Sequence, residues 1–260
     1  MDDKEHGRYF VRSLERGIAV IRAFSADTRE LTLAEIARAT GMSRATARRF
    51  VLTLADLGYL AVATDGRHFR PTARVLEMGF AYLSSLSLAE IALPHLEQLV
   101  AEVQESSSAA VLDGDDVVYV SRVPTRRIMS VSINIGTRLP AHATSLGRVL
   151  LADLDDERLR TYLDRASLRP LTARTLTCRE TLLTELERVR AQGWCLVDQE
   201  LEEGVISIGA PVRNEAGQAV AGVNLATHVR RGDAHWVRET LLPPLLDTVA
   251  RIETELHITG

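Results

Sequence analysis

The 260-residue sequence predicts an α+β protein with an N-terminal winged helix-turn-helix, a linker helix and a larger C-terminal α/β domain. Residues 1–70 carry three helical patterns followed by a hairpin pattern, and residues 71–87 carry one apolar helical stripe that ends in serines. Residues 88–260 alternate strand and helix patterns. We therefore expect domain boundaries near residues 70 and 87.

Charge is distributed unevenly along the chain. Residues 1–85 hold 13 Lys and Arg against 10 Asp and Glu, a balance of +3, whereas residues 86–260 hold 18 against 25, a balance of −7. A weakly basic head on an acidic body is typical of a protein that touches phosphate with one end only.

The composition also excludes several classes. The chain has no run of about 18 apolar residues and starts with Met1, Asp2 and Asp3, so we expect no membrane span, no signal peptide and a cytoplasmic protein. Cys178 and Cys195 form no CxxC pair and have no neighbouring histidine cluster. We expect no disulfide, no metal and no cofactor, and both cysteines to pack as small apolar side chains.

Helix signals are strong in the N-terminal domain. Ser13 is a predicted N-cap of the first helix, and Thr32 with Glu35 forms a capping box at the start of the second. Gly41 predicts a tight turn, after which Ser43 caps a third helix. Residues 59–70 predict a two-stranded wing around the dipeptide at 65–66, Asp-Gly, which favours two-residue turns.

A polar outer face on the third helix predicts DNA binding, because the second helix of such a pair lies in the major groove. Arginines there can reach guanine edges or phosphates. The predicted DNA-binding residues are Ser43, Arg44, Ala45, Thr46, Arg48 and Arg49 on the helix and Arg67 and Arg70 on the wing. The alternative is an ordinary solvated face. The order of capping box, glycine turn, arginine face and wing favours DNA.

The C-terminal domain predicts a helix at 88–105, kinked near Pro94, and a set of strands and helices after it. The strands are expected at 109–112, 117–122, 129–135 and from 195 onward, and the later helices at 146–152, 157–163, 180–191 and 233–256. Together they indicate a sheet with flanking helices.

With these residues in view, the chain resembles the IclR family of bacterial regulators over essentially its whole length. The similar segments are SLERG at 13–17, LAEIA at 33–37, DLGYL at 56–60, GTRLP at 136–140 and residues 193–212. Residues 128–151 and 197–204 resemble the subgroup governing protocatechuate, 4-hydroxybenzoate and β-ketoadipate catabolism. One departure is the wing sequence at 68–70, HFR, where the family often has a Tyr-Arg pair.

The resemblance implies a GAF-like effector domain and assembly of several copies. A dimer would form through the DNA-binding and linker helices, and a tetramer through effector domains. It also implies either repression or activation, with RNA polymerase as a further partner of an activator.

Residues 142–148 predict a loop that delivers hydroxyls and free N–H groups at a helix start, where anions bind readily. The resemblance implies that the family's effector pocket lies at this loop. The predicted ligand-binding residues are Met129, His142, Thr144, Ser145, Leu146, Val197, Val205, Ser207 and Asn224. Some family members carry an acid where this chain has Val197, so an apolar wall suited to a larger or aromatic ligand is implied.

Each of these residues has a structural alternative. Thr144 and Ser145 could be helix caps, Ser207 and Asn224 could satisfy strand ends, and His142 could serve either the pocket or the surrounding structure. Arg138 and Arg148 could balance a ligand carboxylate or lie solvated on the surface. Glu200, Glu202 and Glu203 are interpreted as a solvated hairpin.

We therefore expect a sequence-specific DNA-binding regulator controlled by a small organic acid, with operator DNA, that acid and further copies of the chain as partners. The alternative is an enzyme acting on an organic acid. The sequence lacks GxSxG, Walker A, HExxH and GxGxxG motifs, so we predict no enzymatic activity. A constitutive architectural protein would not need the acidic C-terminal domain.

Overall fold

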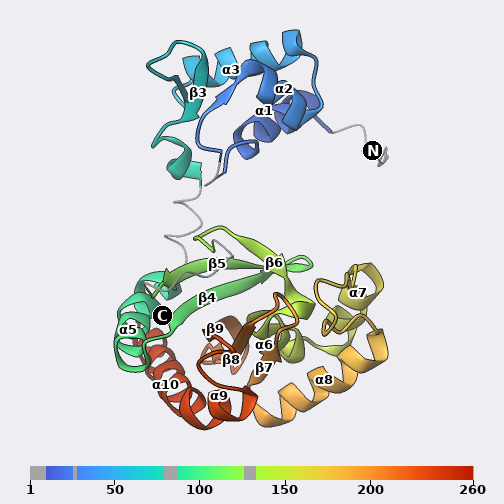
Figure 1. Cartoon of the computed structure of the whole chain (residues 1–260), viewed down its shortest axis with the longest axis vertical. Helices are drawn as coiled ribbons and strands as arrows, with labels where there is room; N and C mark the ends of the chain where they lie inside the picture. Colours follow the sequence, from blue (N-terminus) through green and yellow to red (C-terminus); the bar gives the residue numbers. More distant parts are fainter. Residues whose placement is uncertain (1–9, 26–27, 79–86, 126–132, 260) are drawn as a thin grey trace. The chain divides into compact units, whose positions relative to one another are not determined.

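The computed structural model of the chain describes residues 10–25, 28–78, 87–125 and 133–259. Its contacts divide the chain into two compact units, residues 1–85 and 86–260 (Figure 1). Of the predicted linker helix, residues 75–78 are helical and residues 79–86 lie outside the described residues.

The N-terminal unit packs three helices against a small sheet. Helices α1 (Arg12–Arg22), α2 (Leu33–Thr40) and α3 (Arg44–Asp56) enclose an apolar core. The core residues are Val20, Leu31, Ile36, Val51, Leu54 and Leu60. Strands β1 (Leu31–Thr32), β2 (Leu60–Val62) and β3 (His68–Pro71) pair antiparallel in the order β1-β3-β2.

Local signals fix the helix-turn-helix. The Thr32 hydroxyl accepts a hydrogen bond from Glu35 N at 3.3 Å, and the Glu35 carboxylate accepts one from Thr32 N at 2.8 Å, which confirms the capping box. Gly41 ends α2 with φ 65°, a left-handed conformation that glycine adopts at little cost. Ser43 Oγ then accepts from Thr46 N at 3.2 Å and begins α3, as predicted.

Two N-terminal predictions were wrong. Ser13 lies inside α1, whose N-cap is Val11 and makes no side-chain capping bond. The predicted wing is present as the pair of β2 and β3, which β1 extends to three strands, but its turn is longer than the two residues expected, since Ala63 N donates to His68 O across it at 2.8 Å. The Asp65 carboxylate accepts from the N–H groups of Arg67 and His68, which stabilises this longer turn.

The C-terminal unit is built on a six-stranded antiparallel sheet in the order β6-β5-β4-β9-β8-β7. The strands are β4 (Ser106–Asp113), β5 (Asp116–Val123), β6 (Arg138–Pro140), β7 (Cys195–Asp198), β8 (Val205–Arg213) and β9 (Ala219–His228). The α+β prediction is confirmed.

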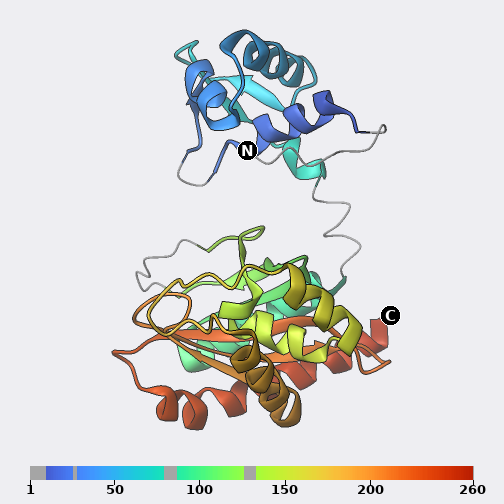
Figure 2. The same ribbon diagram turned by 90° about the vertical axis from the view of Figure 1, so that its right-hand side faces the viewer.

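Helices cover both faces of this sheet. On one face α5 (Ser87–Val103), α9 (Ala234–Thr240) and α10 (Leu242–Thr259) bury residues such as Leu96, Ile208 and Val223. In Figure 2 the red C-terminal helices run along one side of the orange strands. The other face carries α6 (Ser145–Asp153), with α7 (Asp156–Arg165) and α8 (Arg179–Gln192) packed beyond it. A short 3-10 turn, η1 (Ala141–Ala143), leads into α6.

Three C-terminal predictions need correction. The last predicted helix is two helices, because the chain breaks at Leu241 and the two prolines at 243–244 then occupy the first turn of α10, where a missing N–H costs little. Of the strand predicted at 129–135, residues 129–132 lie outside the described residues, and residues 133–135 lead into a turn at Gly136. Cys178 is exposed, whereas Cys195 is buried as expected.

Helix α6 lies unusually close to its neighbours. A Cβ on Gly147 would lie 2.1 Å from the backbone oxygen of Ala141 in η1. A Cβ on Gly209 of β8 would lie 3.0 Å from Ser145 Oγ at the start of α6. A side chain at Gly147 would overlap η1 and one at Gly209 would crowd Ser145, so the start of α6 packs closely against both η1 and the sheet.

Candidate functional site

The recognition helix presents its predicted DNA-binding face to solvent. Ser43, Arg44, Ala45, Arg48 and Arg49 are all exposed on α3. Among the described residues, none of these three arginines has a carboxylate within ion-pair distance, so their charges are free to meet phosphate or a base edge.

Thr46 differs from the rest of this face. It is half-buried, and its hydroxyl hydrogen-bonds to Ser43 Oγ at 2.9 Å. The cap therefore already uses part of its hydrogen-bonding capacity.

The wing carries Arg67 and Arg70, which are both exposed. Between them, His68 forms an ion pair with Asp65, and this hydrogen bond raises the pKa of His68. The N–H groups of Arg67 and His68, together with the His68 ring, hold the pKa of Asp65 below its usual range. The wing tip therefore favours an ionised pair of His68 and Asp65 between the two arginines.

Three of the predicted ligand-binding residues meet in one network, in which Ser145 and Asn224 are buried and Ser207 is half-buried. The hydroxyls of Ser145 and Ser207 are hydrogen-bonded at 2.7 Å, and Asn224 Nδ2 donates to Ser207 Oγ at 2.9 Å. These residues come from α6, β8 and β9. The Ser145 side chain has no room to move toward the sheet because Gly209 lies directly beneath it.

One polar atom of this network lacks a partner. Asn224 is 5% exposed, and its Oδ1 has no hydrogen-bond partner within the described part of the chain. A buried acceptor in this state costs about 1–3 kcal/mol, which a donor on a bound molecule would offset.

The other predicted ligand-binding residues near the start of α6 have structural roles. Thr144 caps the helix, because its hydroxyl accepts from Gly147 N at 2.9 Å. Leu146 is fully buried in the core between α6 and the sheet. His142 is buried, with Nε2 at 3.3 Å from Arg169 O, and burial lowers its pKa, so the ring is neutral at pH 7.

The predicted apolar wall is partly formed. Val197 is buried on β7 and pairs in register with Ser207 of β8, so the two side chains share a face of the sheet. Val205 is half-buried at the start of β8. Met129 lies outside the described residues.

Arg148 and Glu200 correct the prediction of solvated positions. Arg148 is 1% exposed and Glu200 is 8% exposed, and the guanidinium donates to both carboxylate oxygens of Glu200. Arg148 Nε also donates to His142 O at 2.7 Å, and Glu200 accepts from Leu176 N at 3.0 Å. This pair ties α6 to two loops and has no free charge for a ligand.

Arg138 is exposed, which agrees with the surface position given above as the alternative to ligand binding. It pairs with Asp113 at 2.6 Å and Asp116 at 3.2 Å, and hydrogen bonds to these carboxylates raise its pKa.

On the face of the sheet that α6 covers, the structure adds two polar residues that the sequence did not single out, Arg122 and Ser108. Arg122 Nη1 donates to Ser108 Oγ at 3.2 Å, and Ser108 pairs in register with Asn224. The signal was a run of three serines at 106–108 that opens a strand otherwise rich in apolar residues. Serines in a buried strand need partners, and the pattern alone does not say which.

Several other chemistries find no support in this geometry. Across the described ranges, no three His, Cys, Asp or Glu side chains are placed to hold a metal ion. Burial raises the pKa of Cys195 to about 12, so it stays a thiol and is a poor nucleophile. No helix in the described part of the chain is both long and apolar enough to cross a membrane.

Comparison with known proteins places both units in one family. Residues 13–63 match the IclR helix-turn-helix domain, and residues 80–254 match the C-terminal domain of the bacterial transcriptional regulator IclR. The Pca regulon regulatory protein of Pseudomonas putida is 46% identical over 238 residues, which cover 91% of this chain and 81% of that protein. The p-hydroxybenzoate hydroxylase transcriptional activator of Acinetobacter baylyi is 37% identical, covering 92% of this chain and 89% of that protein.

A solved structure agrees over the same length. The crystal structure of an IclR homologue from Microbacterium hydrocarbonoxydans, complexed with 4-hydroxybenzoate, is 27% identical with a TM-score of 0.83. It covers 94% of this chain, and the match includes 98% of that chain. These matches confirm the prediction of a transcription regulator over that of an enzyme. The chain belongs to the IclR family of bacterial transcription regulators.

Proposed function

We propose that this regulator controls genes of aromatic-acid catabolism and that an aromatic acid, or an acid from cleavage of its ring, alters its operator binding. The observation that carries the proposal is the network of Ser145, Ser207 and Asn224 with an unpaired acceptor. Val197 beside it supplies an apolar surface for a carbon frame. The names of the Pca regulon relative and of the 4-hydroxybenzoate complex support the same class of ligand.

DNA reading is assigned to the exposed end of α3 and to the wing. We infer that Ser43, Arg44, Ala45, Thr46, Arg48 and Arg49 lie toward the major groove and that Arg67 and Arg70 reach the flanking backbone. The free charges of the arginines and the N-terminus of α3 support this assignment.

Calorimetric titration of the full chain with 4-hydroxybenzoate, protocatechuate and β-ketoadipate tests the ligand. We expect at least one acid to bind, to raise the melting temperature and to change operator affinity in a gel-shift titration. At a ligand concentration of 100 Kd the stabilisation should be about 2.7 kcal/mol. Binding of none of the three acids would contradict the proposal.

Ser145→Ala refines this experiment. Loss of one hydroxyl from the network should weaken binding by about 1 kcal/mol, or about fivefold. The matched control is Ser167→Ala, because Ser167 is exposed on the same unit. Ser145→Glu is less informative, because Ser145 is fully buried against Gly209 and a carboxylate there would disturb the fold.

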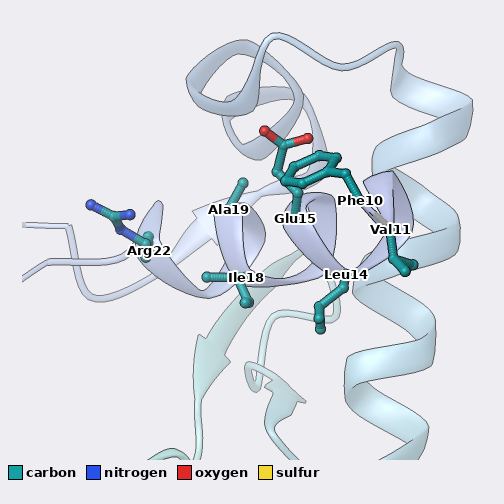
Figure 3. A pocket seen from close by; sticks show the side chains of 7 residues that line it. All are labelled: Phe10, Val11, Leu14, Glu15, Ile18, Ala19 and Arg22. Atoms are coloured by element: carbon teal, nitrogen blue, oxygen red, sulfur yellow. The ribbon is translucent and has the colours of Figure 1, made fainter. Parts of the chain in front are cut away.

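We also propose that the chain forms dimers through α1. Val11, Leu14 and Ile18 are exposed large apolar residues on this helix, and Leu14 is 64% exposed. Figure 3 shows Leu14 and Ile18 pointing to the same side of α1, in a hollow that Phe10 also lines. An apolar stripe on an outer helix face is typical of a surface that meets a second copy.

Leu14→Glu should dissociate this dimer. A carboxylate in an apolar interface loses its hydration without gaining a partner, so we expect the dimer Kd to rise by about a hundredfold or more. Light scattering measures the mass, and Leu57→Glu, another exposed leucine of the same unit, is the control. A mass equal to that of wild type at every concentration would show that α1 is not the interface.

A further inference from the structure

Arg122 is a half-buried cation that has no anionic partner among the described residues. It lies on β5, and its one described hydrogen bond is the donation from Nη1 to Ser108 Oγ at 3.2 Å. No carboxylate among the described residues forms an ion pair with it, and burial lowers its pKa. The other buried arginine, Arg148, is fully paired with Glu200. Burial of a charge without a counter-ion is unfavourable, so this position is suited to an incoming anion.

The sheet places Arg122 in line with the candidate site. Arg122 pairs with Ser108, Ser108 pairs with Asn224, and Asn224 pairs with Gly209. Residues paired across antiparallel strands project from the same face. This row therefore crosses β5, β4, β9 and β8 on the face that α6 covers, and at strand spacing it is about 14 Å long.

The two ends of this row differ chemically. Arg122 at the β5 end is a donor with a full positive charge. Toward the β8 end, Asn224 Oδ1 is a buried acceptor without a donor, beside the hydroxyls of Ser207 and Ser145. A carboxylate is repelled by an acceptor oxygen and attracted by a guanidinium, whereas a hydroxyl can donate to the acceptor.

We propose that Arg122 binds the carboxylate of the effector and that Asn224 Oδ1 accepts a hydrogen bond from a hydroxyl at the opposite end of the same molecule. The inference rests on the proposed function and assigns the orientation of the ligand within that site. The chemical class is an aromatic acid with a hydroxyl remote from its carboxylate. The start of α6 offers only about half a unit of positive charge, so the guanidinium is the stronger receptor for the anion.

The test is a calorimetric comparison of 4-hydroxybenzoate with the neutral 4-hydroxybenzamide on the full chain. Wild type should prefer the acid by about tenfold or more, because a charge-assisted bidentate pair is lost with the amide. Arg122→Met keeps the unbranched apolar stem of the side chain and removes the guanidinium with its charge. It should lower affinity for the acid by about tenfold to a hundredfold and leave affinity for the amide nearly unchanged, which abolishes the preference.

Two controls separate binding from folding. Arg138→Met removes an exposed arginine whose partners are Asp113 and Asp116, and it should leave the preference for the acid intact. The melting temperature of unliganded Arg122→Met should equal or exceed that of wild type, since the variant removes an uncompensated buried charge.

The outcomes distinguish this inference from the proposed function. If wild type binds the acid and Arg122→Met retains the preference, or if the variant loses acid and amide alike, the assignment of Arg122 is wrong and the effector site stands. If wild type binds neither hydroxybenzoate nor the other acids, the proposed function and the assignment both fall.

Discussion

Glu200→Ala should destabilise the C-terminal unit by about 3–5 kcal/mol, because it removes the carboxylate to which the buried Arg148 guanidinium donates twice and leaves only Glu185, at 4.0 Å, as a described anionic neighbour. Arg148 is 1% exposed, so hydration does little to replace the lost carboxylate. The substitution also removes the acceptor of Leu176 N. Helix α6, the loop at Leu176 and the loop at Glu200 would then lose the carboxylate that connects them.

Urea denaturation followed by tryptophan fluorescence measures this effect directly. Both tryptophans, Trp194 and Trp236, lie in the C-terminal unit, so the fluorescence signal reports the unfolding of that unit alone. The control is Asp113→Ala, which breaks the exposed ion pair with Arg138 and should cost about 0–1 kcal/mol.

A double variant identifies the cause of the loss. Arg148→Met with Glu200→Leu replaces both charges by apolar groups and should recover much of the stability lost in Glu200→Ala. A cost below about 1 kcal/mol for Glu200→Ala would mean that water reaches Arg148 and that the pair is not the internal tie described above.

Removal of the arginines of α3 should have the largest effect on DNA binding. Arg44→Ala, Arg48→Ala and Arg49→Ala should each weaken operator binding by about 1–3 kcal/mol, or about fivefold to 150-fold. All three side chains are exposed, so folding should be unaffected. A base contact should relax specificity at one position, whereas a phosphate contact should weaken binding to all sequences and lower the salt dependence.

Gel-shift titration at two salt concentrations separates these cases. Arg160→Ala removes one exposed positive charge from the C-terminal unit and serves as the control for net charge. Wild-type affinity in all three variants would exclude this face of α3 as the reading surface.

Much of the N-terminal unit could be predicted from the sequence, because its signals are local. The capping box at Thr32, the left-handed Gly41 and the Ser43 cap each act within about one helical turn. The wing turn was predicted too short, because the Asp65 carboxylate binds two N–H groups beyond the dipeptide that suggested it.

Most of the candidate effector site could be predicted only through the family resemblance, since the residues alone indicated no more than the helix start at 142–148. Ser145 and Ser207 are 62 residues apart in sequence, and no helical or strand periodicity predicts the hydrogen bond between them. The pair of Arg148 and Glu200 was missed for the same reason. Glu200 precedes two further glutamates at 202–203, a pattern typical of solvated hairpins, and only the fold buries it.

The close contacts of α6 limit how this scaffold can diversify. A side chain at Gly147 would overlap the backbone of η1, and one at Gly209 or Gly222 would press on α6, so a larger residue at any of these glycines would have to displace the helix. New ligand specificities must instead arise from side chains that stand on the strands, such as Val197 and Val205. Related regulators can in this way exchange one effector for another while the backbone that supports the site stays the same.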